Sequence, residues 1–214
     1  LPELLEPRIL KCTSTVCLNK INYLQLANNK LKLFLRTILM NENFDVVDLS
    51  DQPLCQAPRE QVHRENLFHR AVHILVARTS SRLILQQRSE SKDLDPFLWT
   101  SSCSGHVDAG EDYLCAAIRE CEEELGLVED RKSFKEVFRT SPCSETGNEF
   151  VRVYLLMSEQ EIEFNRDEII QTKEFAVKEI DYLIKKQPEV FSVSFKHLFP
   201  FIKKGIWLNE SSLP

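Results

Sequence analysis

The sequence predicts a domain of the α/β or α+β class in which helices flank a mixed β-sheet. Three observations support this fold class. Predicted strands outnumber predicted helices, and the helical segments fall between and after the strands. A hydrophobic content of 43% and a charged content of 28% are ordinary for a globular protein. A length of 214 residues allows one such domain plus an extension.

The first 39 residues are expected to be an extension of the main domain, which we place at residues 40–214. Residues 21–39 show weak helical periodicity, and the segment lacks the short apolar core and cleavage site of a secretory signal. An appended helix, a targeting extension and a segment foreign to the natural protein all remain open.

The first half of the main domain is expected to consist of strands. Apolar residues at 44–49 predict an opening strand, and Pro53 and Pro58 predict a loop after it. Residues 69–77 and 82–88 are rich in β-branched and apolar residues and are separated by a short polar turn. They predict a β-hairpin.

The second half is expected to consist of three strands followed by two helices. The predicted strands are residues 134–139, 149–157 and 174–177, and the predicted helices after them are residues 180–186 and 192–203, the last interrupted by Pro200.

Between these halves, residues 112–125 predict an amphipathic helix. Its apolar stripe consists of Leu114, Ala117, Ile118, Cys121 and Leu125. Gly126 follows directly, where a left-handed residue often ends a helix.

Three carboxylates, Glu120, Glu123 and Glu124, are expected to share one face of this helix, away from the apolar stripe. Their mutual repulsion becomes attraction when a divalent cation is bound, and Mg²⁺ is the usual cation where carboxylates meet phosphates. A solvated acidic face is the alternative for such a run of charges.

The spacing of the whole segment from Gly105 to Leu127 favours the metal site over a solvated face. The specified positions are Gly105, Glu111, Arg119, Glu120, Cys121, Glu123, Glu124, Gly126 and Leu127. This pattern resembles the signature of the Nudix hydrolases, in which Cys121 is a slightly unusual apolar choice. The resemblance implies a Nudix-type mixed sheet sandwiched between helices.

The resemblance also implies an activity: hydrolysis of a nucleoside diphosphate linked to another group, or of a similar small-molecule diphosphate, as a pyrophosphatase that needs Mg²⁺ or Mn²⁺. Glu120, Glu123 and Glu124 would be the metal ligands, with a backbone carbonyl near Ser104–Gly105. Metal-bound water would attack phosphorus, because bound metals lower the pKa of water.

Other residues receive supporting roles. Glu111 and Arg119 are expected to form an ion pair that holds the loop against the helix, and Gly105 and Gly126 shape the ends of the motif. Which glutamate is the general base stays open: Glu120 and Glu123 are candidates, and Glu149 is the preferred extra carboxylate, with Glu168 as its rival. Candidate substrate-binding residues are Arg70, Arg88, Lys92 and His106, and ordinary surface charges are the alternative for the cations.

Residues 44–195 are also similar to one branch of this family, which contains the type 1 isopentenyl-diphosphate isomerases. The shared features are HRAVHILV, LILQQRS, W-T-x-S and the Gly-His that opens the motif. Such isomerases have a reactive cysteine directly before that glycine, where this chain has Ser104. We call the segment from Gly105 to Leu127 the Nudix box. Because a hydroxyl is far less acidic than a thiol, and because all the glutamates of this box are present, a hydrolase is favoured over an isomerase. A non-catalytic Nudix module that binds a nucleotide is the third reading, which the intact glutamates disfavour.

The five histidines divide into two groups. His63, His69 and His106 lie near the isomerase histidines by this resemblance, so a ligand role and a structural role both stay open. For His73 and His197 a hydrogen-bonded structural role is favoured.

The net charge and the length of the apolar runs argue against some classes of partner. A net charge of −6 argues against a nucleic-acid binder, and no run approaches 18 apolar residues, so no membrane span is expected. Seven cysteines without a C-x-x-C pair favour a reducing compartment, the cytoplasm. Cys115 and Cys121 are expected to be buried in the helix. The substrate's identity and the oligomeric state are not encoded in these patterns.

Overall fold

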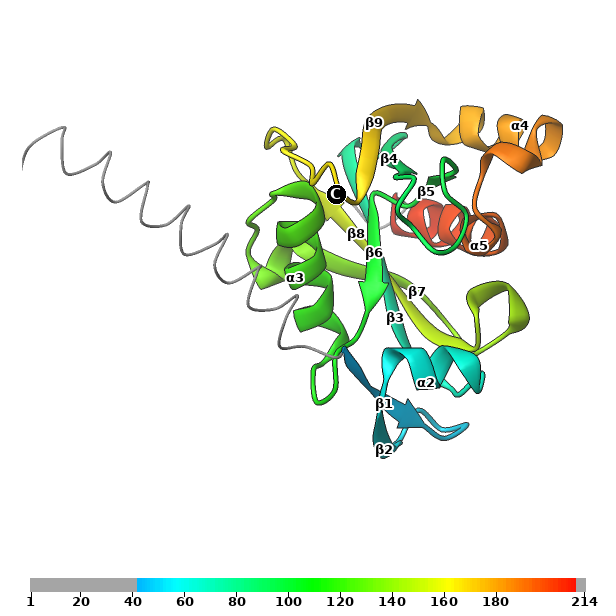
Figure 1. The fold of residues 1–214 in the computed structure, drawn as a ribbon. Helices are drawn as coiled ribbons and strands as arrows, with labels where there is room; N and C mark the ends of the chain where they lie inside the picture. The colour runs from blue at the N-terminus through cyan, green and yellow to red at the C-terminus, as the bar shows by residue number, and fades with distance from the viewer. Residues whose placement is uncertain (1–41, 211–214) are drawn as a thin grey trace, which may run out of the picture. The chain divides into compact units, whose positions relative to one another are not determined.

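The computed structural model describes residues 42–210, with side chains described through residue 205 (Figure 1). The expected boundary near Met40 and the periodic segment at 21–39 lie outside the described residues, so the division of the chain at residue 40 stays a prediction. No helix in the described part of the chain is long and apolar enough to cross a membrane.

The opening strand pairs with a strand that the sequence did not predict. β1 (Asn43–Val47) runs antiparallel to β2 (Pro53–Pro58), which forms a two-stranded sheet with it. The expectation of a loop between Pro53 and Pro58 was therefore wrong. Both prolines stand at the ends of β2, where a missing N–H interrupts the hydrogen-bond ladder least. The short helix α2 (Arg59–Arg64) follows directly.

A seven-stranded mixed sheet forms the centre of the domain. Its strands are β3 (His69–Thr79), β4 (Arg82–Arg88), β5 (Trp99–Thr100), β6 (Cys103–His106), β7 (Phe134–Thr140), β8 (Glu149–Met157) and β9 (Ile169–Ala176). β3 and β8 are parallel, and every other pair is antiparallel. The predicted β3–β4 hairpin is confirmed.

β3 has different partners along its length, and this arrangement brings several strand ends together. On one edge it pairs with β6 through residues 71–74 and then with β4 through residues 76–79, while β8 follows the other edge throughout. The N-terminal ends of β3 and β8 and the end of β6 therefore lie together, because His69 is opposite Glu149 and Ala71 is opposite His106.

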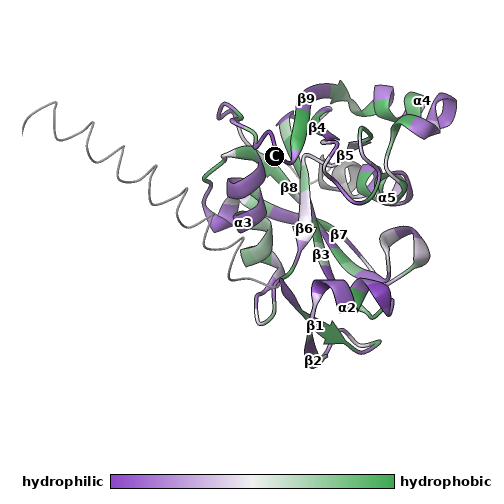
Figure 2. Ribbon diagram, viewed as in Figure 1, coloured by the Kyte–Doolittle hydropathy of each residue, from purple (hydrophilic) through white to green (hydrophobic). Residues whose placement is uncertain are grey.

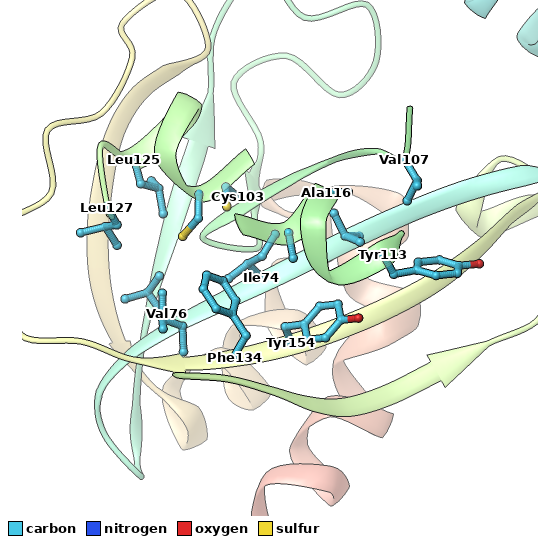
Figure 3. Packing of buried hydrophobic residues seen from close by; sticks show 14 of the residues in the cluster. Ile74, Val76, Cys103, Val107, Tyr113, Ala116, Leu125, Leu127, Phe134 and Tyr154 are labelled. Carbon is cyan, nitrogen blue, oxygen red and sulfur yellow. The ribbon is translucent and has the colours of Figure 1, made fainter. Parts of the chain in front are cut away.

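Helices cover both faces of this sheet, as the fold class predicted. α3 (Tyr113–Leu125) packs on the face that carries Val72, Ile74 and Val76 of β3, in the cluster drawn in Figure 3. α5 (Val193–Glu210) and α4 (Val177–Lys186) pack on the opposite face, against Ala71 and Leu75. Figure 2 shows hydrophilic and hydrophobic stretches along both α3 and α5, as expected for helices with one face in a core.

The last elements differ from the prediction in their bounds. β9 spans eight residues where a short strand at 174–177 was expected, because seven residues of β4 hold it in register. α5 continues through Pro200 rather than breaking there. A proline removes a single N–H from the helix, and the packed residues Phe195, Phe199 and Ile202 on both sides of it are fully buried.

Candidate active site

α3 begins and ends where the sequence predicted. The side chain of Asp112 caps the helix by accepting hydrogen bonds from the backbone N–H groups of Leu114 and Cys115 at 2.9 and 2.8 Å. Gly126 ends it in the left-handed region with φ 68°. Both ends of α3 are therefore set by residues next to them in the sequence, Asp112 and Gly126.

The buried face of α3 is rotated relative to the predicted stripe. Leu114 and Ile118 are only partly buried, whereas Tyr113 and Ala116 are buried. Two adjacent alanines, Ala116 and Ala117, allow the helix to approach the sheet closely, and that contact turns the glutamate face toward β6. The expected separation of apolar and acidic faces was therefore wrong for Glu124, which is only 4% exposed.

The box carboxylates differ in burial. The side chain of Glu120 is 13% exposed, and that of Glu123 is 38% exposed. Glu120 lies against the backbone of Gly105: a Cβ on residue 105 would be 2.1 Å from the Glu120 carboxylate carbon. Glycine at this position is what allows a carboxylate to reach the backbone of β6.

Burial changes the acidity of these groups. Burial raises the pKa of Glu120 to about 7, although the Arg119 guanidinium acts in the opposite direction, and the neighbouring Glu124 adds to the rise. Burial also raises the pKa of Glu124, against the effects of Lys92 and Gln86. Two buried carboxylates in contact with few cations form a site where a divalent cation would be stabilised.

Arg119 connects the box carboxylates to the loop before the helix. It donates to Glu111 at 2.9 and 3.2 Å, to Glu120 at 2.6 Å and to Glu123 at 3.3 Å. It also donates to the backbone oxygen of His106 at 3.0 Å. The ion pair of Arg119 with Glu111 is therefore present, and one guanidinium orients three carboxylates and the end of β6.

Glu124 has a second set of partners from β4 and the loop after it. Lys92 lies 3.4 Å from Glu124 and also pairs with Glu168, and Gln86 donates to Glu124 at 3.0 Å. The Gln86 Oε1 atom is buried and has no hydrogen-bond partner. Lys92, a predicted substrate-binding residue, thus lies beside the box, and so does Glu168.

The two predicted arginines lie in different places: Arg70 is at the start of α3, whereas Arg88 is close enough to Glu124 for their charges to interact. Arg70 donates to Asp51 at 2.6 Å and contacts the Tyr113 ring, near the start of α3. Arg88 donates to the backbone oxygen of Leu94. Two surface hollows in the described region, one lined by Phe164 and Arg166 and one by Thr172 and Glu174, do not include the box glutamates.

A second group of donors consists of His63, His69 and His106, which come from α2, β3 and the end of β6. Their ligand atoms lie within 4.8 Å of one another, and their ring centroids are 5.0 to 5.2 Å apart. The Phe44 ring of β1 stacks on His69 and His106. The Nε2 atoms of His63 and His69 are buried without a hydrogen-bond partner.

Glu149 completes this histidine cluster. Its carboxylate lies 3.1 Å from Nε2 of His106 and 3.6 Å from Nε2 of His69. Burial alone would raise the pKa of Glu149, but the contact with His106 and the nearby His69 ring outweigh burial and hold the pKa well below its usual range. Burial lowers the pKa of His63 to about 4, and the neighbouring histidines add to this effect.

The donor set of the histidine cluster fits a divalent cation. Nδ1 of His69 lies 2.9 Å from the backbone oxygen of Leu67, and this contact orients the ring with Nε2 toward the cluster. Neutral imidazoles and a carboxylate are ligands that borderline divalent metals accept. Sequence reasoning left the role of His63 and His69 open, because only pairing between strands brings them together.

The positions of the cysteines decide whether a thiol is available next to Gly105. Cys103 is fully buried beside Cys121 of α3, and burial raises the pKa of its thiol well above its ordinary value. Ser104 lies on the opposite side of β6 and is partly exposed. Cys121 is buried as expected, whereas Cys115 is only partly buried, with its thiol beside Asp112 and Arg131.

Most of the described part of the chain is similar to known proteins. The model of the NUDIX domain matches residues 67–195. The chain is 35% identical over 152 residues to Nudix hydrolase 3 of Arabidopsis thaliana, which covers 67% of the chain but only 20% of that relative. It therefore spans about a fifth of the length of this relative.

Other similar proteins have nearly the same length as the matched region. Isopentenyl-diphosphate Delta-isomerase 2 of Photorhabdus laumondii is 30% identical over 161 residues, which cover 74% of the chain and 91% of that protein. The crystal structure of DR0079 from Deinococcus radiodurans matches with a TM-score of 0.66 and 26% identity, over 74% of the chain and 98% of DR0079.

Proposed function

Since the chain belongs to the Nudix family, we propose that it hydrolyses a small molecule containing a diphosphate, with Mg²⁺ or Mn²⁺ held by Glu120, Glu123 and Glu124. The family itself was predicted from the box spacing and is confirmed. The observation that supports the proposal most is the contact of Glu120 with Gly105, which brings two buried carboxylates to the edge of β6.

The residues of the chain contribute orientation and charge. Arg119 holds Glu111, Glu120 and Glu123 in one hydrogen-bonded set, and Lys92 reaches Glu124 from the opposite side. A divalent cation bound among these carboxylates would lower the pKa of bound water and neutralise charge on the diphosphate. If the cation replaces Lys92 as the partner of Glu124, the Lys92 ammonium is free to pair with a phosphate oxygen of the substrate.

The candidates for the general base differ in their surroundings. Glu149 is held in its ionised form by two histidines, which makes it a weak proton acceptor near neutral pH. Glu123 is the most exposed of the box carboxylates and reaches solvent. We therefore prefer Glu123 to Glu149 as the general base, in addition to its place among the metal ligands, and assign Glu120 and Glu124 to metal binding alone.

An isomerase is the second candidate, and the cluster of His63, His69 and His106 with Glu149 favours it. The thiol that such chemistry would use argues against it. Cys103 is buried in the core with a raised pKa, and Ser104 stands at the position next to Gly105. The histidine cluster is therefore assigned a metal-binding role in a hydrolase.

The test is a panel of diphosphate substrates assayed with Mg²⁺ and with Mn²⁺, with release of phosphate or nucleotide as the readout. We expect Glu123→Gln to lower the rate on the best substrate by at least about two orders of magnitude. Glu122→Gln, on the exposed side of the same turn, is the matched control and should keep full activity. Equal rates for Glu123→Gln and the parent would refute the metal assignment.

The same substrates also test the isomerase reading. Interconversion of the two five-carbon isoprenoid diphosphates without phosphate release would support the isomerase instead. We expect small molecules rather than nucleic acids as partners, and the cytoplasm as the compartment, which the five free cysteines of the described region support.

A further inference from the structure

A second group of potential ligands lies away from the box and the histidine cluster, where the loop between β7 and β8 meets α5. Cys143 precedes the short 3₁₀ helix η2 (Ser144–Thr146), Glu145 lies within it, and His197 is on α5. Their donor atoms lie within 4.8 Å of one another. We propose that Cys143, Glu145 and His197 form a binding site for Zn²⁺.

The chemistry of these donors favours zinc over magnesium or calcium. A thiolate, an imidazole and a carboxylate are the three side-chain types that Zn²⁺ accepts, whereas Mg²⁺ and Ca²⁺ take oxygen ligands. Three protein ligands leave the fourth tetrahedral position for water or another small ligand.

The distance between the first two donors already fits a shared cation. Sγ of Cys143 lies 3.6 Å from Nε2 of His197. With Zn–S and Zn–N bonds of about 2.3 and about 2.0 Å at a tetrahedral angle, those atoms should be about 3.5 Å apart. Glu145 is exposed, so its side chain can rotate toward the cation without displacing packed atoms.

The backbone around the site is fixed by hydrogen bonds. The carbonyl of Cys143 accepts from Asn148 N–H at 2.9 Å, and Thr146 Oγ1 lies 3.4 Å from the Cys143 amide. α5 packs against η2, and its residues Phe195, Leu198 and Phe199 are buried in the core. Both ligand-bearing segments are therefore held in place before any cation binds.

The site is close in sequence to Glu149, the carboxylate that contacts the histidine cluster. Thr146 donates to the carbonyl of Glu149 at 3.3 Å, and Gly147 and Asn148 connect η2 to Glu149. Zn²⁺ at Cys143 would join α5 to the loop that positions Glu149. We therefore expect zinc to raise the melting temperature of the protein, because a ligand that binds only the folded state stabilises it.

The experiment uses the full chain with Co²⁺ in place of Zn²⁺, because Co²⁺ bound to a thiolate gives a charge-transfer absorption band in the near ultraviolet. The box and the histidine cluster contain no thiol ligand, so they do not produce this band. We expect the band in the parent and in Cys115→Ser, whose partly buried thiol is the matched control. We expect its loss in Cys143→Ser.

Two further variants test the other ligands. His197→Gln and Glu145→Gln should each weaken Zn²⁺ binding, measured by competition with a chromophoric chelator, by more than about tenfold. Absence of the band in the parent, or its survival in Cys143→Ser, would overturn the proposal. Thermal unfolding of Cys143→Ser without added metal confirms that the variant folds, so a lost band with a retained unfolding transition identifies the zinc site independently of the proposed activity.

Discussion

Gly105 and Glu120 are in contact across the β6–α3 connection, so closely that a side chain on residue 105 would overlap the Glu120 carboxylate. The contact joins the glycine that opens the box to one of its acidic residues, fifteen positions later. Gly105 does not have a positive φ; among the described glycines only Gly110, Gly126 and Gly147 do. Glycine is therefore needed at residue 105 for the space that a missing side chain leaves, not for its backbone conformation.

Gly105→Ala should therefore reduce hydrolysis through displacement of Glu120. We expect a loss of at least about tenfold in kcat/KM and a higher Mg²⁺ requirement, measured by metal titration of the rate. Gly110→Ala is the contrasting variant, because Gly110 has φ 77° and no neighbour within 4 Å of an added Cβ. It should cost about 1 kcal/mol of stability through backbone strain, with a smaller loss of activity.

Arg119 contributes to stability as well as to geometry. Arg119→Lys keeps the positive charge but cannot reproduce the forked contacts to Glu111, Glu120 and the His106 carbonyl. We expect a loss of about 1–3 kcal/mol in the free energy of unfolding, measured with urea. Arg131→Lys, at an exposed ion pair with Asp112, should leave the free energy of unfolding nearly unchanged, because water screens exposed ion pairs. Equal effects of the two substitutions would contradict the role of Arg119 as the connecting residue.

Cys103 distinguishes the hydrolase from the isomerase. Because its thiol is buried in the core beside Cys121, Cys103→Ala should lower stability by about 1 kcal/mol and leave the hydrolysis rate per folded molecule within about twofold. The measurements are thermal unfolding and the diphosphate assay. A loss of turnover in a folded Cys103→Ala variant would instead favour proton transfer by this thiol.

His73 should make stability depend on pH. It is buried beside Ser101, 2.7 Å from the hydroxyl, and burial lowers its pKa to about 4 from 6.5. Between these values the unfolded chain binds a proton that the folded protein excludes, so stability falls as the pH falls from about 6.5 to about 4, by up to about 3 kcal/mol.

The control for this pH dependence is His73→Asn, which keeps a polar partner for Ser101. Urea unfolding at several pH values should show a shallower decline for the variant between pH 6.5 and 4. Part of the decline should persist, since the pKa of His63 is lowered in the same direction. Parallel stability curves for variant and parent would show that His73 does not contribute.

Much of the fold could be predicted because the sequence patterns that indicate it lie within single helices and strands. The cap at Asp112, the left-handed Gly126 and the spacing of Glu120, Glu123 and Glu124 are set within one helix and its ends. The family follows from this same segment. Strands such as β3 and β8 were recognised from their own apolar residues. The strand at Pro53–Pro58 was missed because only pairing with β1 makes it a strand.

By itself, the sequence determined the fold class, the family and the helix that carries the box, because each depends on residues within a few turns of one another. The resemblance placed His63, His69 and His106 near one site, and the structure shows their distances to one another and to Glu149. The tertiary structure alone decided that Glu124 is buried and that His197 faces Cys143. These contacts join residues up to about eighty positions apart. They depend on strand register and helix packing, which no local pattern specifies.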